Sequence, residues 1–182
     1  MTNENSAMGT EQPLHIAAIV IDTPSGADHL LLEFSMHLKK SGWQVRGLIQ
    51  QKQLATSGCQ VWLRDVSNDN LYPISQHLGS LSTSCQIDTS GMVEAGIALR
   101  RITEDNTDLA IFNRFSGLEA QGQGFAQEML SLMSLGIPVI TIVPERHLAA
   151  WRHFTGGMAS ELKADRQALE RWFSEQHTDS SR

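Results

Sequence analysis

The sequence predicts an α/β fold of three layers, in which helices cover both faces of a mostly parallel β-sheet. Two observations indicate this fold class. Short runs of branched apolar residues alternate along the chain with segments of helical periodicity, which is the pattern of consecutive βαβ units. The apolar runs are also nearly unbroken by polar residues, as expected for parallel strands that are buried on both faces.

Size and composition fit one globular domain. The 182 residues are enough for one well-packed domain and too few for two ordinary ones. Hydrophobic residues make up 41% of the chain and charged residues 19%, which is the balance of a folded domain. We therefore expect a single domain over residues 14–176, with polar disordered tails at residues 1–13 and 177–182.

Charge and hydropathy argue against two kinds of partner. The formal net charge of −6 argues against nucleic acid, because phosphate neutralisation requires clustered Lys and Arg. No apolar run approaches the roughly 20 residues that span a bilayer, and residues 1–13 lack the hydrophobic segment of a secretory signal. The sequence predicts a cytoplasmic protein without a nucleic-acid or membrane partner, and it is compatible with a homo-oligomer.

The first βα unit follows from the apolar pattern. Leu14–Ile21 is almost entirely Ile, Val and Ala and predicts the first strand. Ser25 and Asp28 have the spacing of a capping box, which predicts that the first helix has Ser25 as its N-cap. Apolar residues at helical spacing follow, and the helix is expected to end at Gly42. Val45–Gln50 predicts the second strand.

Residues 52–88 depart from this alternation and predict a β-hairpin insertion. Gln60–Val66 alternates in hydrophobicity and is rich in Val, Trp and Leu. The polar turn Ser67–Asn70 follows it, and Leu71–Ser75 has the length and composition to pair with it.

The second half of the chain returns to the alternation. Leu109–Phe112 and Ile137–Val143 predict two further buried strands, each after an amphipathic helix. The expected helices are Thr89–Thr103, Phe125–Leu135, Glu145–Phe154 and Ala164–Gln176.

The segment after Leu109–Phe112 carries the strongest functional signal. It turns abruptly polar at Asn113 and Arg114 and then enters a loop that contains Gly122 and Gly124. Ligands of open α/β sheets bind at the carboxyl ends of the strands, where Arg and Asn present donors to an anion. The alternative is a strand end whose polar side chains only cap and solvate a turn.

The turn after the first strand differs from a phosphate-binding loop of a hydrolase. Such a loop needs a Lys on the phosphates and a Ser or Thr hydroxyl on magnesium. Here Ala27 stands at the lysine position and Asp28 at the hydroxyl position, and Asp22 adds another carboxylate. Two carboxylates repel a triphosphate, and the helix dipole offsets only about 1 kcal/mol of this. Thr23 and Ser25 can still donate hydrogen bonds to a small ligand.

The segment after Ile137–Val143 and the two cysteines give further predictions. Arg146 lies in the first turn after Ile137–Val143, where it can face an anion at the same sheet edge as Arg114. Trp151 is expected in the core. Thiolate and imidazole ligands suit a soft metal, but without a CxxC motif the cysteines are expected to be ordinary buried residues. The weak metal candidates are Cys59, His77 and Cys85.

A dispersed set of motifs resembles a known family. Over roughly Leu14 to Leu162, the chain resembles a bacterial family of unknown function whose genes often lie beside molybdate-uptake genes. That family is distantly similar to the P-loop nucleoside-triphosphatases known from thermophiles. The motifs include Ile19–Asp22, Gly47–Gln50, Leu63–Asp65, Ile74–Gln76, Cys85–Asp88, Asn113–Phe115, Glu119–Gly122, Gly136–Val139 and Leu148–Arg152.

The resemblance implies a P-loop-like fold with a hairpin insertion and degenerate Walker motifs. Hydrolytic relatives place an Asp for magnesium and a Glu for water after the strand equivalent to Leu109–Phe112. Asn113 and Arg114 stand at those positions here, and neither supplies a carboxylate. Glu119, further along, is expected either to pair with Arg114 or to cap the glycine loop.

Three classes of function remain open, and the sequence favours the first. This is a non-catalytic protein that binds a small anion, with a molybdenum oxyanion indicated by the gene neighbourhood of the family. The second is an enzyme that processes a nucleotide or phosphate compound by an unrecognised mechanism, and the third is a partner protein without a ligand. No cofactor is assigned. The predicted ligand-binding residues are Asp22, Thr23, Ser25, Asn113, Arg114, Gly122, Gly124 and Arg146.

Overall fold

The apolar runs of the sequence form the interior of one mixed β-sheet. The computed structural model describes residues 15–23, 26–55, 58–77, 85–104 and 106–178. The strands in these ranges are β1 (Ile16–Ile21), β2 (Val45–Ala55), β3 (Gly58–Asp65), β4 (Leu71–Pro73), β5 (Ser75–His77), β6 (Cys85–Ile87), β7 (Leu109–Ile111), β8 (Val139–Pro144) and β9 (Ser160–Leu162). Seven of these strands form a sheet of order β4-β3-β2-β7-β8-β1-β9, and β5 and β6 form a separate ribbon.

Five neighbouring strands of this sheet, β2, β7, β8, β1 and β9, are parallel to one another. This arrangement confirms the predicted fold class. β1 pairs with β8 from Ile16 opposite Val139 to Ile21 opposite Pro144. β7 pairs with β2 on one side and with β8 on the other, so it is an interior strand as predicted. Every residue of β7 and β8 is buried, which is why their sequences are unbroken apolar runs.

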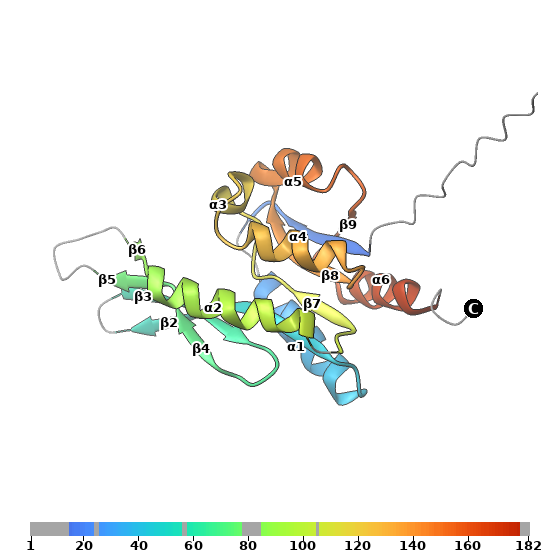
Figure 1. Ribbon diagram of the computed structural model, residues 1–182, viewed down its shortest axis with the longest axis horizontal. Coiled ribbons are helices and arrows are strands. Elements are labelled where there is room, and N and C mark those ends of the chain that lie inside the picture. The colour runs from blue at the N-terminus through green and yellow to red at the C-terminus, as the bar shows by residue number, and fades with distance from the viewer. Residues whose placement is uncertain (1–14, 24–25, 56–57, 78–84, 105, 179–182) are drawn as a thin grey trace, which may run out of the picture.

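Helices cover both faces of the sheet (Figure 1). The described helices are α1 (Ala27–Lys40), α2 (Thr89–Arg101), α3 (Gly117–Ala120), α4 (Ala126–Ser134), α5 (Leu148–Phe154) and α6 (Arg166–Thr178), with the 3₁₀ turns η1 (Ile102–Glu104) and η2 (Glu145–His147). α1 and α6 pack on one face, and α2, α4 and α5 pack on the other. Trp151 of α5 is fully buried, as predicted. No helix in the described ranges is long and apolar enough to cross a membrane.

The hairpin insertion is present and is longer than the sequence indicates. β2 continues past Gln50 and pairs antiparallel with β3, from Leu48 opposite Asp65 to Ala55 opposite Gly58. The predicted pairing of β3 with the next segment is confirmed in β4. Backbone hydrogen bonds hold such a two-stranded extension, so its polar residues give no periodic signal in the sequence.

The start of the first helix differs from the prediction. α1 begins at Ala27, and its N-cap is Gly26, which has a φ of 47°. The N-cap is therefore one residue later than the predicted Ser25, and no side chain in the described residues caps this helix. The Asp28 carboxylate binds Arg114 instead. Ser25 lies outside the described residues.

The C-terminal region differs from the prediction in two respects, the end of the last helix and one additional strand. α6 continues to Thr178, because the ring of His177 packs against Phe173 and Trp43 at centroid distances of 4.2 and 4.7 Å. The predicted tail therefore does not include residues 177 and 178, and residues 1–14 and 179–182 lie outside the described ranges. β9 pairs in parallel with β1 over only three residues, too few to produce a hydrophobic period.

Candidate functional site

An ion pair joins the ends of two sheet strands at their carboxyl edge. Arg114 follows β7, and Asp28 lies in the first turn of α1, which follows β1. Arg114 Nη2 donates to Asp28 Oδ2 at 2.6 Å, and the two side chains are 17% and 26% exposed. Because β1, β7 and β8 are parallel, their carboxyl ends meet at one edge, which is where ligands of such sheets bind.

Buried polar atoms in this region lack partners. Among the described residues, Arg114 Nε, Asp28 Oδ1 and Asn113 Oδ1 have no hydrogen-bond partner. An unsatisfied buried polar atom costs about 1–3 kcal/mol, so a ligand or an ordered water that bonds to these atoms would stabilise the region. The ion pair is therefore only partly satisfied by the protein itself.

The turn after β1 is less favourable to an anion. Asp22 Oδ1 accepts hydrogen bonds from the backbone N–H of Thr23 at 2.6 Å and from its hydroxyl at 3.1 Å. The hydroxyl bond and then the backbone bond lower the pKa of Asp22 from its usual value. Both residues are exposed. This turn presents a carboxylate to solvent, and the Thr23 hydroxyl is already used.

Glu119 serves the glycine loop and does not pair with Arg114. Its Oε2 accepts from the backbone N–H and the hydroxyl of Ser116, at 3.0 and 2.7 Å, in a capping box at the start of α3. Its Oε1 accepts from the Phe125 backbone N–H at 3.2 Å, and the residue is 4% exposed. The predicted capping role of Glu119 is confirmed.

The two glycines of this loop have different surroundings. Gly122 and Gly124 both have positive φ, 74° and 58°, which favours glycine. A Cβ at Gly124 would lie 2.1 Å from Glu119 Oε1, whereas a Cβ at Gly122 would have no neighbour within 4 Å. Gly124 therefore has a packing role in addition to any role in binding.

Arg146 lies in the turn after β8 but is not joined to the Arg114–Asp28 pair. The predicted helix starts as the 3₁₀ turn η2, and α5 begins only at Leu148. Arg146 is exposed, and its Nε donates to His147 Nε2 at 3.2 Å. No hydrogen bond or ion pair between described residues connects it with Arg114 or Asp28.

The metal candidates are only partly placed. His77 and Cys85 are opposite each other in the β5–β6 ladder, and Cys59 is opposite Leu54 in the β2–β3 ladder. The side chains of these three candidates are outside the described part of the structure. Among the residues that are described, no group of three or more His, Cys, Asp or Glu side chains is arranged to hold a metal ion.

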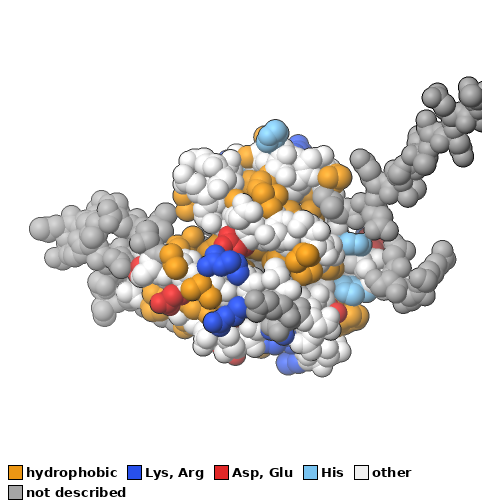
Figure 2. Space-filling view, in the orientation of Figure 1, with side chains coloured by type: hydrophobic (Ala, Val, Ile, Leu, Met, Phe, Trp, Pro, Cys, Tyr) orange, Lys and Arg blue, Asp and Glu red, His pale blue; other side chains and the backbone are white. Residues whose placement is uncertain are grey.

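Two grooves flank the site region, and they differ in chemistry. A groove of about 450 Å³ between α2 and α4 has a mostly apolar lining and lies on the face shown in Figure 2. Its charged residues Arg100 and Glu128 already bind each other at 2.6 Å. A groove of about 360 Å³ lies beside Asp28, between the start of α1 and the outer part of β2. The latter is lined by Gly26, Asp28, His29, Leu32, Ile49, Gln50, Gln51, Lys52 and Arg64.

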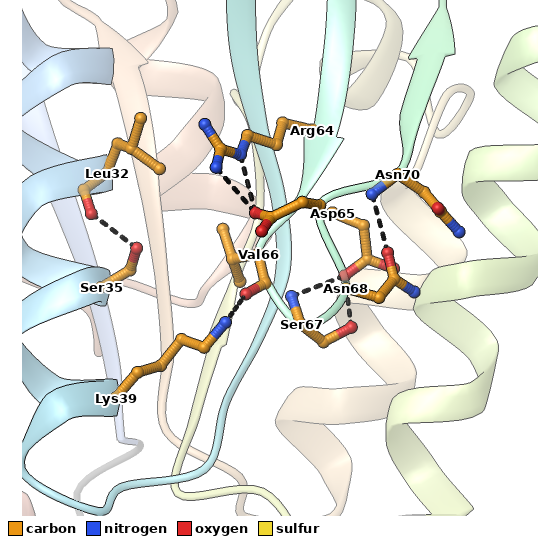
Figure 3. A network of polar contacts seen from close by, with 10 residues as sticks. Leu32, Ser35, Lys39, Arg64, Asp65, Val66, Ser67, Asn68 and Asn70 are labelled. Carbon is orange, nitrogen blue, oxygen red and sulfur yellow. Dashed lines mark hydrogen bonds and ion pairs between the residues drawn. The ribbon is translucent and has the colours of Figure 1, made fainter.

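Polar contacts tie α1 to the turn between β3 and β4 (Figure 3). Lys39 of α1 donates to the backbone oxygen of Val66. Arg64 donates through Nε and Nη2 to Asp69 Oδ1, at 2.9 and 2.7 Å, and this contact lowers the pKa of Asp69. Arg64 lines the groove beside Asp28. Its side chain is thus fixed in position, and its charge is offset by Asp69.

Comparison with known proteins agrees with this fold. The solution structure of a human cancer-related nucleoside triphosphatase has a TM-score of 0.63 at 16% identity, and the match covers 92% of this chain and 99% of that one. The crystal structure of THEP1 from the hyperthermophile Aquifex aeolicus has a TM-score of 0.63 at 14% identity, with 91% and 99% covered. At such identities the likeness establishes the fold alone, which is the P-loop nucleoside-triphosphatase-like α/β fold that the sequence predicts.

A sequence relative and a family description complete the comparison. The chain is 35% identical over 163 residues to the molybdenum import ATP-binding protein ModC 2 of Bradyrhizobium diazoefficiens. The match covers 88% of this chain and only 18% of that longer protein. A family description matches residues 16–172, which is most of the folded region. The chain therefore belongs to the family described as "Protein of unknown function (DUF2478)".

Proposed function

We propose that this domain binds a small oxyanion and does not hydrolyse nucleoside triphosphates. The observation that carries the proposal is the Arg114–Asp28 ion pair. In a hydrolase, the position of Asp28 supplies a hydroxyl to magnesium and the position after β7 supplies acidic groups. Here the two positions bind each other, so the only carboxylate at these two positions is already paired with a guanidinium and is not free to hold a magnesium ion.

The residue before Asp28 supports the same proposal. A phosphate-binding loop of a hydrolase uses a lysine at this position, and this chain has Ala27, which is 2% exposed. A methyl group buried in the core contributes no charge to a phosphate. Glu119 is not available as a base either, because its two carboxylate oxygens accept three hydrogen bonds and the side chain is buried.

Donors for an anion remain at the same place. A guanidinium has five N–H groups, and Asp28 accepts from Nη2 while the buried Nε has no partner among described residues. The start of α1 adds backbone N–H groups without a side-chain cap, and such groups attract anions. A tetrahedral oxyanion can accept two hydrogen bonds from Arg114 in the planar fork geometry.

The proposed anion is an oxyanion of molybdenum. The sequence relative is named as an ATP-binding protein of molybdenum import, and this chain corresponds to a small part of it. The proposed role is recognition of the transported anion, or of a product made from it, beside a separate ATP-hydrolysing unit. The proposed location is the cytoplasm, where ATP is available, and the proposed partner is such an importer.

Calorimetric titration with molybdate, tungstate, sulfate and phosphate tests the binding. Arg114→Ala is expected to weaken binding roughly ten- to a hundredfold, because a charge-assisted hydrogen bond contributes about 1.5–3 kcal/mol. Arg114→Lys should recover only part of the loss, because an ammonium lacks the planar fork. Arg166→Ala is the matched control, since Arg166 is exposed on α6 and its ion pair in the described part of the chain is with Glu170.

Two results would contradict the proposal. One is the absence of binding of all four anions to the wild type, or binding that Arg114→Ala leaves unchanged. The other is magnesium-dependent release of phosphate from ATP or GTP that is abolished in Asp28→Ala. Measurement of phosphate release with and without magnesium, on both proteins, covers the second case.

A further inference from the structure

The groove beside Asp28 is larger than an inorganic oxyanion. Its volume is about 360 Å³, and Asp28, the partner of Arg114, forms part of its wall. One water takes roughly 30 Å³ in the liquid, and a tetrahedral oxyanion takes roughly the space of two or three waters. Sites for small organic ligands begin at about 300 Å³. An oxyanion at Arg114 would therefore leave most of the adjoining groove empty.

This groove is lined by both apolar and polar residues. Leu32, which is half-buried, supplies apolar surface, whereas Ile49 is almost completely buried and adds little. Gln50 and Gln51 supply amide or backbone groups at its wall. Apolar surface favours a carbon-containing body, because removal of such surface from water is favourable. An inorganic ion would gain nothing from it.

Among the described residues, the ion pairs around the groove leave Lys52 without a partner. Asp28 is paired with Arg114, and Arg64 is paired with Asp69. Lys52, exposed on the outer part of β2, makes no ion pair with any described residue. Lys52 thus places an ammonium on one wall of the groove, and Asp28 on another wall connects the groove to Arg114, which is its ion-pair partner and is not itself part of the lining.

Resting on the proposed function, we propose that the natural ligand is an organic molecule with two acidic groups. One acidic group binds at Arg114, the carbon-containing body lies along Leu32, and the second acidic group binds Lys52. The oxyanion site is then the recognition point for one end of the ligand, and the groove selects the rest of it.

Fructose 1,6-bisphosphate and inorganic phosphate are suitable probes, because the first has phosphate groups at both ends of a carbon body. Calorimetry on the wild type is expected to give at least tenfold tighter binding of the bisphosphate. Lys52→Ala should weaken bisphosphate binding about tenfold and leave phosphate and molybdate binding unchanged. Lys163→Ala, which changes an exposed lysine in the segment between β9 and α6, is the matched control.

The outcomes separate this inference from the proposed function. If phosphate or molybdate binds through Arg114 but the bisphosphate binds no more tightly, or if Lys52→Ala leaves its binding unchanged, the two-ended ligand is wrong and the oxyanion site stands. If Lys52→Ala weakens phosphate as much as bisphosphate, Lys52 belongs to the oxyanion site and the inference also fails. If no anion depends on Arg114, both proposals fail.

Discussion

Two carboxylates near the carboxyl edge of the sheet, Glu119 and Asp28, lie in the first turns of different helices. Glu119 accepts three hydrogen bonds inside its own loop and is 4% exposed. Asp28 bonds through one oxygen to an arginine from another part of the chain, and its other oxygen has no partner among described residues. A fully satisfied polar group stabilises a local structure. The free oxygen of Asp28 can accept a hydrogen bond only from a donor such as water, so of this pair the arginine is the partner that an anion can use.

The largest expected effect comes from removal of the satisfied carboxylate. Glu119→Ala leaves the donors of Ser116 and Phe125 without their acceptor, and each buried unsatisfied donor costs about 1–3 kcal/mol. We expect the free energy of unfolding to fall by about 3–5 kcal/mol in urea denaturation. Glu175→Ala, an exposed carboxylate on α6, is the control and should have little effect. A loss for Glu119→Ala as small as that of the control would show that the loop does not depend on this side chain.

The next effect separates packing from backbone conformation in the same loop. Gly124→Ala and Gly122→Ala both place a Cβ at positive φ, which costs about 1–2 kcal/mol. Only Gly124→Ala also pushes against Glu119, so we expect it to destabilise the protein by about 2 kcal/mol more. Equal losses would argue against the contact. Anion titration of the stabler Gly122→Ala variant tests whether the loop also contributes to binding, as the sequence predicts.

Asp28→Asn tests the partly satisfied carboxylate. It removes a negative charge that competes for Arg114 and keeps a similar shape, so anion affinity should rise roughly tenfold, or about 1.4 kcal/mol. Titration of molybdate and phosphate measures the change. A decrease in affinity would mean that Asp28 orients Arg114 for the ligand and does not compete with it.

An exposed pair should give the smallest effect. Arg152 donates to both oxygens of Glu161, at 2.6 and 2.8 Å, and the pKa of Glu161 is lowered by these hydrogen bonds. A lowered folded-state pKa adds stability above the unfolded value of 4.5, and this is lost as the pH falls through the folded value. Glu161→Gln should therefore be slightly less stable than the wild type at pH 7, and thermal unfolding should show this difference shrink below pH 4.5 and disappear below the lowered folded-state pKa. A difference that persists in acid would exclude the ion pair as its cause.

The sequence was sufficient for the interior of the fold. The parallel strands around β7 have unbroken apolar runs, because both of their faces are covered, and such runs are visible without a structure. β9 and the outer part of β2 were not predicted, because three residues define no period and the outer hairpin is held by backbone pairing that needs no hydrophobic pattern. The hydrophobic pattern of the sequence therefore predicts the strands that are buried on both faces, and it does not predict short strands or strand extensions.

The candidate site was predicted only at its centre. Asn113 and Arg114 were predicted because they are polar residues directly after an apolar strand. The bond between Arg114 and Asp28 was not predicted, because the spacing of Ser25 and Asp28 indicated a helix cap. A signal for the true arrangement was present: Asp28 and Arg114 have opposite charges at two positions that share one magnesium ion in hydrolases. Lys52 and Arg64 were missed because the groove brings together segments that are distant in sequence.

Arg114 and Asp28 are attached to parts of the fold that differ in stability. All three residues of β7 are buried, and the strand is paired on both sides, so its amides are expected to exchange with solvent only in global unfolding. Arg114 lies three residues after the end of this strand, beyond the buried Phe112. Asp28 lies in the first turn of α1, where backbone groups lack intrahelical partners and local opening costs less. Separation of the two side chains should therefore proceed by movement of the helix start, while the arginine stays in place to receive the ligand.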